Sequence, residues 1–329
     1  MTTFLEQLEA RVRNLSGQVR VLFPESGDRR VMDAAQRLKR EGLGDPIMVN
    51  AEGEAAEGLT HVAIDGAKAD ELAKLLVELR GHKGMTEDEA KRLSRDPLIY
   101  GMYLLRIGEA DALVAGAVRT TSDVLRAGLW LVEKEEGIKT ISSSFYMLVP
   151  PFRGGFEEVI TFADCGVVET PTSEQLADIA IAAADARTFI VGDEPRLAFL
   201  SFSTKGSGGT SESVARVRDA IGLVQKRRPD ILLAEHELQG DAALVASVAE
   251  RKVPGSAVAG TANVLIFPSL DAANIAYKLV ERLVPGAQAL GPIVHGFKSP
   301  VHDLSRGASS DDIFRSALIA VIRAKKNQT

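Results

Sequence analysis

Four side chains that could bind an anion and move a proton lie within eight residues near the end of the chain: Ser305, Arg306, Asp311 and Asp312. Apolar residues with helical spacing follow from residue 313. The spacing therefore predicts the hydroxyl and the guanidinium on a loop that enters a helix, with both carboxylates in its first turn. Helix N-termini attract anions through free backbone N–H groups, and arginine binds phosphate through two parallel hydrogen bonds. The segment is therefore a candidate phosphate site.

A structural role fits the same residues. Ser309 followed by Asp312 has the spacing of a capping box, in which the carboxylate returns to the backbone of the first residue. Arg306 would then be an ordinary surface charge. On spacing alone, capping is the more common explanation.

Two further loops follow predicted strands. A glycine-rich loop after the strand at 196–202 contains four candidate ligand-binding residues: Thr204, Lys205, Gly206 and Ser207. Its amides could approach a phosphate, although it lacks the Gly-Lys-Ser/Thr ending of a P-loop and a flexible turn fits as well. The loop at 118–123 follows a buried strand at 112–117 and leads into a helix. Further candidate ligand-binding residues are Thr120 and Thr121 on this loop and Arg126 on the helix. The alternative is a plain helix cap by Thr121 or Ser122.

A polar stripe is predicted on the helix that Asp271 is expected to cap. Asn274, Lys278 and Arg282 are each four residues apart and so share one face. A neighbouring face is apolar and consists of Ile275, Leu279 and Leu283. Such a stripe usually faces solvent, but on a helix beside a cleft its donors would bind an anion.

The composition is that of a soluble globular protein with about two domains. The chain has 329 residues, 26% of them charged, and a net charge of −6, which gives a nucleic-acid role no support. Its single cysteine, Cys165, excludes an internal disulfide and is more often a packing residue than a nucleophile. No apolar run is long enough for a transmembrane helix, and the first fifteen residues lack a signal-peptide core, so we expect a cytoplasmic protein. The five histidines show no metal-ligand spacing.

Strands and helices alternate along most of the chain, which predicts an α/β protein with mostly parallel sheets. The motifs above lie where such strands end, and ligands of open α/β sheets bind at the carboxyl ends of the strands.

The motifs resemble those of the phosphate acetyltransferase (phosphotransacetylase) family. The similarity covers nearly the whole chain and is densest from residue 162 to residue 312. The most specific match is Pro300-Val301, one unmatched position, then Asp303-Leu304-Ser305-Arg306-Gly307, with Asp311-Asp312. Further matches are Leu200-Ser201-Phe202-Ser203-Thr204-Lys205-Gly206-Ser207 and Asn274-Ile275 with Tyr277-Lys278-Leu279-Val280 and Arg282. Arg119 and His302 depart from the family pattern.

The resemblance implies two α/β domains with an interdomain cleft, similar to isocitrate dehydrogenases. The first domain would be 1–140 plus 300–329 and the second 141–299. The implied reaction is acetyl-CoA plus phosphate giving acetyl phosphate plus CoA, without metal or redox cofactor, through a ternary complex in a homodimer. Arg306 and Arg282 would bind phosphate, Ser305 and Arg306 would stabilise the carbonyl oxygen, and Asp312 would be the base. The alternatives are a longer acyl chain such as butyryl, or a non-catalytic module that senses CoA or acyl phosphate.

Overall fold

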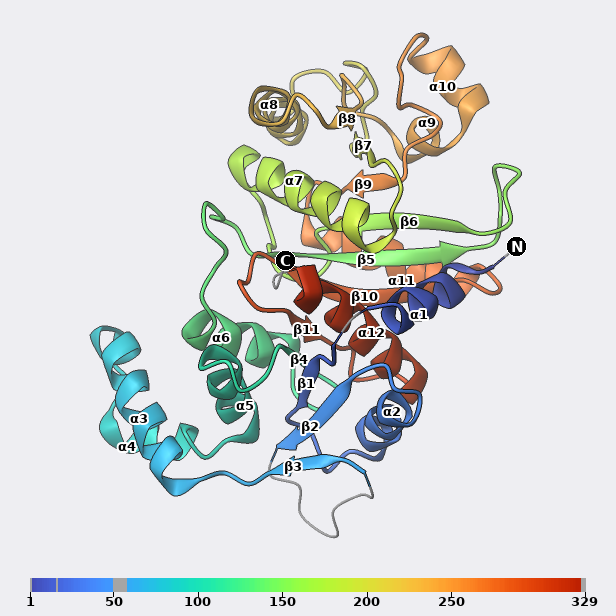
Figure 1. Cartoon of the computed structure of the whole chain (residues 1–329). Coiled ribbons are helices and arrows are strands. Elements are labelled where there is room, and N and C mark those ends of the chain that lie inside the picture. The colour runs from blue at the N-terminus through green and yellow to red at the C-terminus, as the bar shows by residue number, and fades with distance from the viewer. Residues whose placement is uncertain (1, 16, 50–57, 327–329) are drawn as a thin grey trace. The chain divides into compact units, whose positions relative to one another are not determined.

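The computed structural model describes residues 2–15, 17–49 and 58–326 (Figure 1). The chain forms two compact units, which we call the terminal unit and the middle unit. The terminal unit comprises Leu5–Glu136 and Phe297–Thr329, and the middle unit comprises Met1–Phe4 and Gly137–Gly296. Each is described here by itself. The α/β prediction is confirmed.

The terminal unit is built on a parallel sheet with strand order β3-β2-β1-β4-β11. Its strands are β1 (Arg20–Phe23), β2 (Asp45–Val49), β3 (Thr60–Val62), β4 (Ala112–Ala115) and β11 (Val301–Asp303). The helices are α1 (Phe4–Arg13), α2 (Arg29–Arg40), α3 (Gly66–Arg80), α4 (Glu87–Leu93), α5 (Pro97–Arg106), α6 (Thr121–Leu131) and α12 (Ser310–Lys326), with a 3-10 turn at Gly81–Lys83. β4 is buried along its whole length, as its uniformly apolar sequence predicts.

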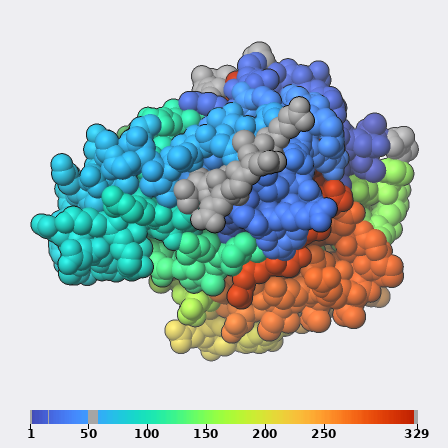
Figure 2. Space-filling model, turned by 90° about the horizontal axis from the view of Figure 1, so that it is seen from below, coloured from blue at the N-terminus to red at the C-terminus, as the bar shows by residue number. Residues whose placement is uncertain are grey.

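Helices cover both faces of this sheet. α2 and α12 pack on each other and α12 packs on β1 and β4, whereas α5 packs on β4 and α6 (Figure 1). α3 and α4 pack on each other and protrude at one end of the unit, where they are the cyan surface of Figure 2. The apolar face of α2, formed by Val31, Ala34, Ala35 and Leu38, is buried as its helical spacing predicts.

The middle unit has strand order β10-β5-β6-β9-β7-β8. Its strands are β5 (Ser142–Val149), β6 (Glu158–Ala163), β7 (Arg196–Phe199), β8 (Leu232–Leu233), β9 (Val264–Ile266) and β10 (Gln288–His295). β5 and β6 form an antiparallel hairpin, and β6, β9, β7 and β8 are mutually parallel. The helices are α7 (Ser173–Ile190), α8 (Glu212–Arg227), α9 (Gly240–Leu244), α10 (Ala246–Lys252) and α11 (Leu270–Leu283).

The middle unit has two hydrophobic cores. One contains apolar residues of α7 and α8, and the other contains residues of α9 and α11. The strand predicted at 196–202 ends earlier, at Phe199, so the polar loop after it is longer than expected. No helix within the described ranges is both long and apolar enough to cross a membrane.

Two predicted helix caps are wrong. α6 is capped by Thr120 rather than by Thr121 or Ser122, because Thr120 forms a reciprocal capping box with Asp123. α11 is capped by Ser269, whose side chain accepts from the N–H of Ala272, and Asp271 lies inside the first turn. Several polar residues near each helix start could serve as caps, and the backbone conformation selects among them.

Candidate active site

The predicted residues of the terminal unit gather at one edge of its sheet. β1, β4 and β11 are adjacent and parallel, so the segments that follow them emerge side by side at their carboxyl ends. These segments are Pro24–Asp28 after β1, Gly116–Thr120 after β4 and Leu304–Ser309 after β11. The last of them carries Ser305 and Arg306.

The predicted capping box at the start of α12 is present. Asp312 Oδ2 accepts hydrogen bonds from the Ser309 N–H at 2.9 Å and the Ser309 hydroxyl at 2.7 Å, and Ser309 Oγ accepts from the Asp312 N–H at 3.2 Å. Asp312 Oδ1 lies 3.8 Å from an Arg315 nitrogen. Asp312 therefore caps the helix through Oδ2, while Oδ1 takes no part in the capping box and lies at the outer limit of an ion pair with Arg315.

Asp311 and Arg306 are placed differently from Asp312. Asp311 Oδ1 accepts from Arg37 of α2 at 2.9 Å, which gives this carboxylate a structural role. Ser305 and Arg306 are exposed on the loop, and within the described part of the chain no hydrogen bond or ion pair engages the Arg306 guanidinium. The Arg306 guanidinium is thus unpaired among the described residues, and Arg306 lies four residues before the start of α12 at Ser310.

The loop after β4 binds a carboxylate of the protein itself. Glu25 accepts four hydrogen bonds from the successive N–H groups of residues 116–119, at 2.7 to 3.0 Å. Successive amides in such a loop form an anion-binding concavity. Here Glu25, which follows β1, fills it.

The predicted ligand residues near this loop already have partners. The Thr120 hydroxyl bonds Asp123, and Arg126 pairs with Asp123. The Thr121 hydroxyl donates to Asp303 at 2.6 Å. Their predicted contacts with substrate stay a prediction, and ligand binding would have to rearrange or share these hydrogen bonds.

The ends of β4 and β11 approach each other closely at Gly116. Its φ is +107°, and a Cβ there would lie 2.4 Å from Asp303 Oδ1 and 2.6 Å from the Leu304 nitrogen. Only glycine fits this contact. Asp303 is completely buried, and burial raises its pKa to about 7, against the opposing effect of the Thr121 hydrogen bond.

Asp303 should therefore make stability depend on pH. Its folded pKa of about 7 exceeds the ordinary value of 3.8, so the folded state binds the proton more tightly and stability falls as pH rises between these values. At 1.36 kcal/mol per pKa unit, the loss is about 4 kcal/mol. Asp303→Asn should flatten this part of the profile, measured by urea unfolding at pH 4.5, 6 and 7.5. Asp271→Asn, at an exposed position, should keep the wild-type slope. Parallel profiles for Asp303→Asn and wild type would contradict the assignment.

The two departures from the family pattern have local structural partners. The Arg119 guanidinium pairs with Asp96, whose carboxylate also caps α5. His302 is buried in β11, and burial lowers its pKa well below the ordinary value, so the ring is neutral. Its Nδ1 lies 3.0 Å from the Ser316 carbonyl oxygen of α12, to which it donates. Both residues stabilise the scaffold of the site.

In the middle unit, the amides of the glycine-rich loop are also engaged within the protein. Glu237 is buried and accepts from the Gly206 N–H at 2.8 Å, from the Ser203 hydroxyl at 2.7 Å and from Arg218. Burial opposes its ionisation, but Arg218 and the other donors lower its pKa to about 2. The Thr204 N–H donates to Ser207 Oγ, and the Gln239 N–H donates to Thr204 Oγ1.

A ligand could therefore bind this loop through its side chains rather than through free backbone amides. Lys205 is exposed, has a φ of +47°, and its ammonium has no partner within the described ranges. The loop follows β7, and α11 follows the adjacent parallel strand β9, so both begin at the same edge of the sheet.

On α11, the predicted polar stripe is accessible. Lys278 and Arg282 are exposed and Asn274 is half-buried. The Lys278 ammonium donates to the Tyr277 hydroxyl at 2.8 Å, and Arg282 lies 3.5 Å from Glu281. The neighbouring apolar face is exposed too, with Ile275 at 58%, Leu279 at 51% and Leu283 at 72%.

Cys165 is a packing residue in the middle unit. It is 1% exposed, burial raises its pKa well above the ordinary value, and its thiol donates to the Phe162 carbonyl oxygen at 3.3 Å. A buried, protonated thiol is a poor nucleophile. We therefore expect Cys165→Ala to keep its activity, apart from any loss of folded protein. Ping-pong kinetics, or an acylated Cys165 isolated during turnover, would contradict this expectation.

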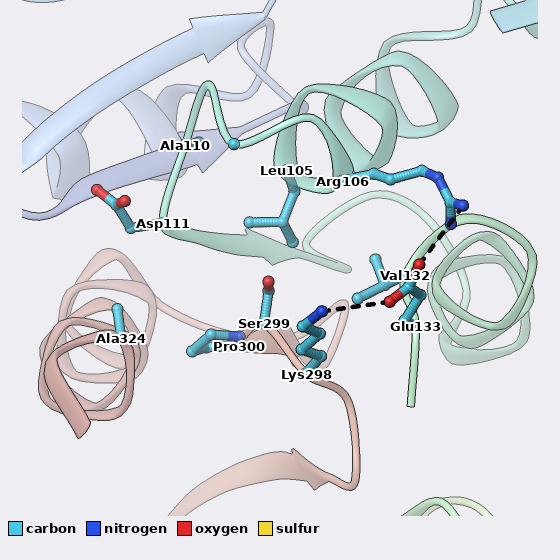
Figure 3. A pocket seen from close by; sticks show the side chains of 11 residues that line it. Leu105, Arg106, Ala110, Asp111, Val132, Glu133, Lys298, Ser299, Pro300 and Ala324 are labelled. Carbon is cyan, nitrogen blue, oxygen red and sulfur yellow. Dashed lines mark hydrogen bonds and ion pairs between the residues drawn. The ribbon is translucent and has the colours of Figure 1, made fainter. Parts of the chain in front are cut away.

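A separate cavity of about 300 Å³ lies at the opposite edge of the terminal sheet (Figure 3). Its lining includes Ala110 and Asp111, which precede β4, and Ser299 and Pro300, which precede β11. Figure 3 shows Arg106 and Lys298 both directed at Glu133, at 3.7 and 3.3 Å. No predicted site residue lines this cavity, and the opposite ends of the same strands carry the site loops.

The sequence predicts no individual role for Asp303 or Glu237, and for the charged turn from Glu25 to Arg30 it predicts a structural role. The charged turn after the first strand and the aspartate inside the most specific motif were the available signals. Among the described residues, no three His, Cys, Asp or Glu side chains are arranged to hold a metal ion.

Comparisons with known proteins agree along the whole chain. The family model described as Phosphate acetyl/butaryl transferase matches residues 3–321. A phosphate acetyltransferase of Clostridium acetobutylicum is 41% identical over 93% of this chain and 95% of its own length. A phosphate acetyltransferase of Bacillus subtilis is 39% identical over 93% of this chain and 95% of its own length. The crystal structure of a phosphotransacetylase from Streptococcus pyogenes matches with a TM-score of 0.88 at 36% identity, covering 99% of this chain and 100% of that one.

Proposed function

The chain belongs to the Phosphate acetyl/butaryl transferase family, and we propose that it catalyses the reversible reaction of acetyl-CoA with phosphate to give acetyl phosphate and CoA. The main support is that relatives named phosphate acetyltransferase match it at about 40% identity over nearly their full length. The exposed, unpaired Arg306 beside the capped start of α12 supplies the cation that two anionic substrates require.

The proposed chemistry is direct transfer in a ternary complex. A phosphate oxygen attacks the thioester carbonyl carbon, the new C–O bond forms, the C–S bond breaks, and CoA leaves as a thiolate that takes up a proton. Arg306 and Arg282 bind phosphate, and Ser305 and Arg306 donate to the carbonyl oxygen as it gains charge.

Toward acetyl-CoA, the CoA thiol must lose its proton before it attacks acetyl phosphate. A free thiol titrates at about pH 8.5, so a base assists at neutral pH. We assign this role to Asp312, whose Oδ1 is not used by the capping box. Protonated Asp312 returns the proton to the leaving thiolate in the opposite direction.

Substrate contacts in the two units remain part of the proposal. In the middle unit these are Lys278 and Asn274 of α11, with Thr204, Lys205, Gly206 and Ser207. In the terminal unit they are Thr120, Thr121 and Arg126. We further propose that the chain has the two domains predicted from the sequence, 1–140 with 300–329 and 141–299. The reaction should need no metal or redox cofactor, so dialysis against EDTA should leave kcat unchanged.

The test of the proposed function is an assay of CoA-dependent acyl phosphate formation with acetyl-, propionyl- and butyryl-CoA. We expect the highest kcat/KM for acetyl-CoA. A preference for butyryl-CoA would favour the longer-chain alternative, and a lack of turnover with all three, despite CoA binding, would favour a sensing module.

We also propose a cytoplasmic homodimer. The exposed apolar face of Ile275, Leu279 and Leu283 supports self-association, because contiguous exposed apolar residues commonly mark protein interfaces. Sedimentation of wild type and Leu279→Asp measures this directly. A wild-type monomer at micromolar concentration would contradict the dimer.

A further inference from the structure

Arg30 forms an unusually complete set of hydrogen bonds for a side chain to which the proposed reaction gives no role. It lies in the first turn of α2, after β1. Its Nη1 donates to the carbonyl oxygens of Arg306 at 2.9 Å and Ala308 at 2.8 Å. Its Nη2 donates to the carbonyl oxygen of Ala117 at 2.9 Å and to Asp28 Oδ2 at 2.8 Å, and its Nε donates to Asp28 Oδ1 at 3.1 Å. All five guanidinium donors are therefore used.

The three carbonyl groups belong to two different loops of the same sheet edge. Arg306 and Ala308 lie on the loop after β11, and Ala117 lies on the loop after β4. One guanidinium thus joins the two loops, while Asp28 fixes its orientation through two oxygens. The amides of the β4 loop are held at the same time by Glu25. Glu25 and Arg30, which both follow β1, therefore bind the loop after β4 from both sides: Glu25 accepts from its N–H groups and Arg30 donates to its Ala117 carbonyl oxygen.

The loop after β11 has few other restraints. Ala308 N–H donates to the Ser305 carbonyl oxygen at 2.8 Å, and Gly307 N–H donates to Ser305 Oγ at 3.3 Å, both inside the loop. Within the described residues, the bonds to residues 305–308 from outside this loop come from Arg30. Arg30 therefore fixes the backbone of Arg306 while the Arg306 side chain stays free.

We propose that Arg30 is a positioning residue that holds the Arg306 loop in the geometry needed to bind phosphate. This inference deepens the proposed function and rests on it for its kinetic consequences. A lysine could not replace Arg30, because an ammonium is a point charge and lacks the planar fork that reaches carbonyl groups of two loops at once.

The kinetic test compares Arg30→Met and Arg30→Lys with Arg29→Met. Arg29 is the adjacent residue, 94% exposed, with one ion pair of 3.9 Å to Asp33. With phosphate varied at saturating acetyl-CoA, kcat/KM for phosphate should fall about 100-fold in Arg30→Met, as expected for a misplaced binding group. Arg30→Lys should recover only a small part of the loss, and Arg29→Met should behave as wild type. A folded Arg30→Met or Arg30→Lys with wild-type kcat/KM would overturn the proposal.

A double-mutant cycle separates positioning from a general structural role. If Arg30 acts through Arg306, then adding Arg30→Met to Arg306→Ala should cost little beyond the single Arg306→Ala change. Full additivity of the two losses would show that Arg30 acts independently and would overturn the proposal.

Trypsin cleavage gives a readout that does not depend on activity. The Arg306–Gly307 bond is exposed, and its carbonyl oxygen is the one that Arg30 binds. Arg30→Met should speed cleavage at this bond by about tenfold or more, because local opening becomes easier, while Arg29→Met should not. Unchanged cleavage would overturn the positioning role. Faster cleavage in a protein whose wild type lacks acetyl transfer would refute the proposed function alone.

Discussion

Replacing Asp312 with asparagine should lower kcat toward acetyl-CoA by roughly 10²–10⁴, the usual contribution of a general base. Asparagine can still offer an oxygen to the Ser309 N–H, so the capping box should be largely retained and stability should change by about 1 kcal/mol or less. The defect should shrink as pH rises toward the thiol pKa, since the nucleophile then ionises without help. Thermal melts and a pH–rate profile of this variant measure both effects.

Asp311→Asn is the matched control for this variant. Asp311 occupies the same first turn of α12, but its carboxylate pairs with Arg37 and is 62% exposed. We expect Asp311→Asn to keep kcat near the wild-type value. A large but pH-independent defect in Asp312→Asn would indicate that Asp312 positions substrate, and normal kcat would leave it only the capping role that the structure shows.

Replacing Arg306 with alanine should remove a charge-assisted contact to phosphate, worth about 1.5–3 kcal/mol or more. This corresponds to a loss of about 10- to 150-fold in kcat/KM for phosphate. The thermal midpoint should not change, because the guanidinium is exposed and has no partner within the described residues. Steady-state kinetics with phosphate as the varied substrate measure the loss.

Arg306→Lys and Arg29→Ala complete this experiment. Lysine keeps the positive charge but lacks the planar guanidinium, so Arg306→Lys should lose less kcat/KM for phosphate than Arg306→Ala and more than wild type. Arg29→Ala removes an exposed arginine from the neighbouring segment and should have no effect. An Arg306→Ala protein with unchanged KM and kcat would show that phosphate binds elsewhere.

Local patterns predicted a large part of this structure. The capping box at Ser309 and Asp312 and the strand at β4 both follow from short-range spacing. The α/β class follows from the alternation of elements. Such features could be predicted because each depends on residues close together in the sequence.

The contacts that organise the site connect residues far apart in the chain. Glu25 binds amides more than ninety positions away, and Arg30 binds carbonyl groups at Ala117 and Arg306. Spacing within a segment carries no information about such pairs. The pKa of Asp303 likewise depends on the burial of its side chain at the end of β11, against Gly116, which the motif alone does not reveal.

The carboxylate of Glu25 has a consequence for the use of oxyanions as inhibitors. A tethered anion competes at a high effective concentration, so free sulfate, phosphate or vanadate would have to displace Glu25 to occupy residues 116–119. The four N–H groups of this loop already donate to Glu25. We therefore expect simple oxyanions to compete with substrate phosphate only at cationic side chains. Their inhibition constants should change when Arg306 is replaced, and should not depend on the amides of the β4 loop.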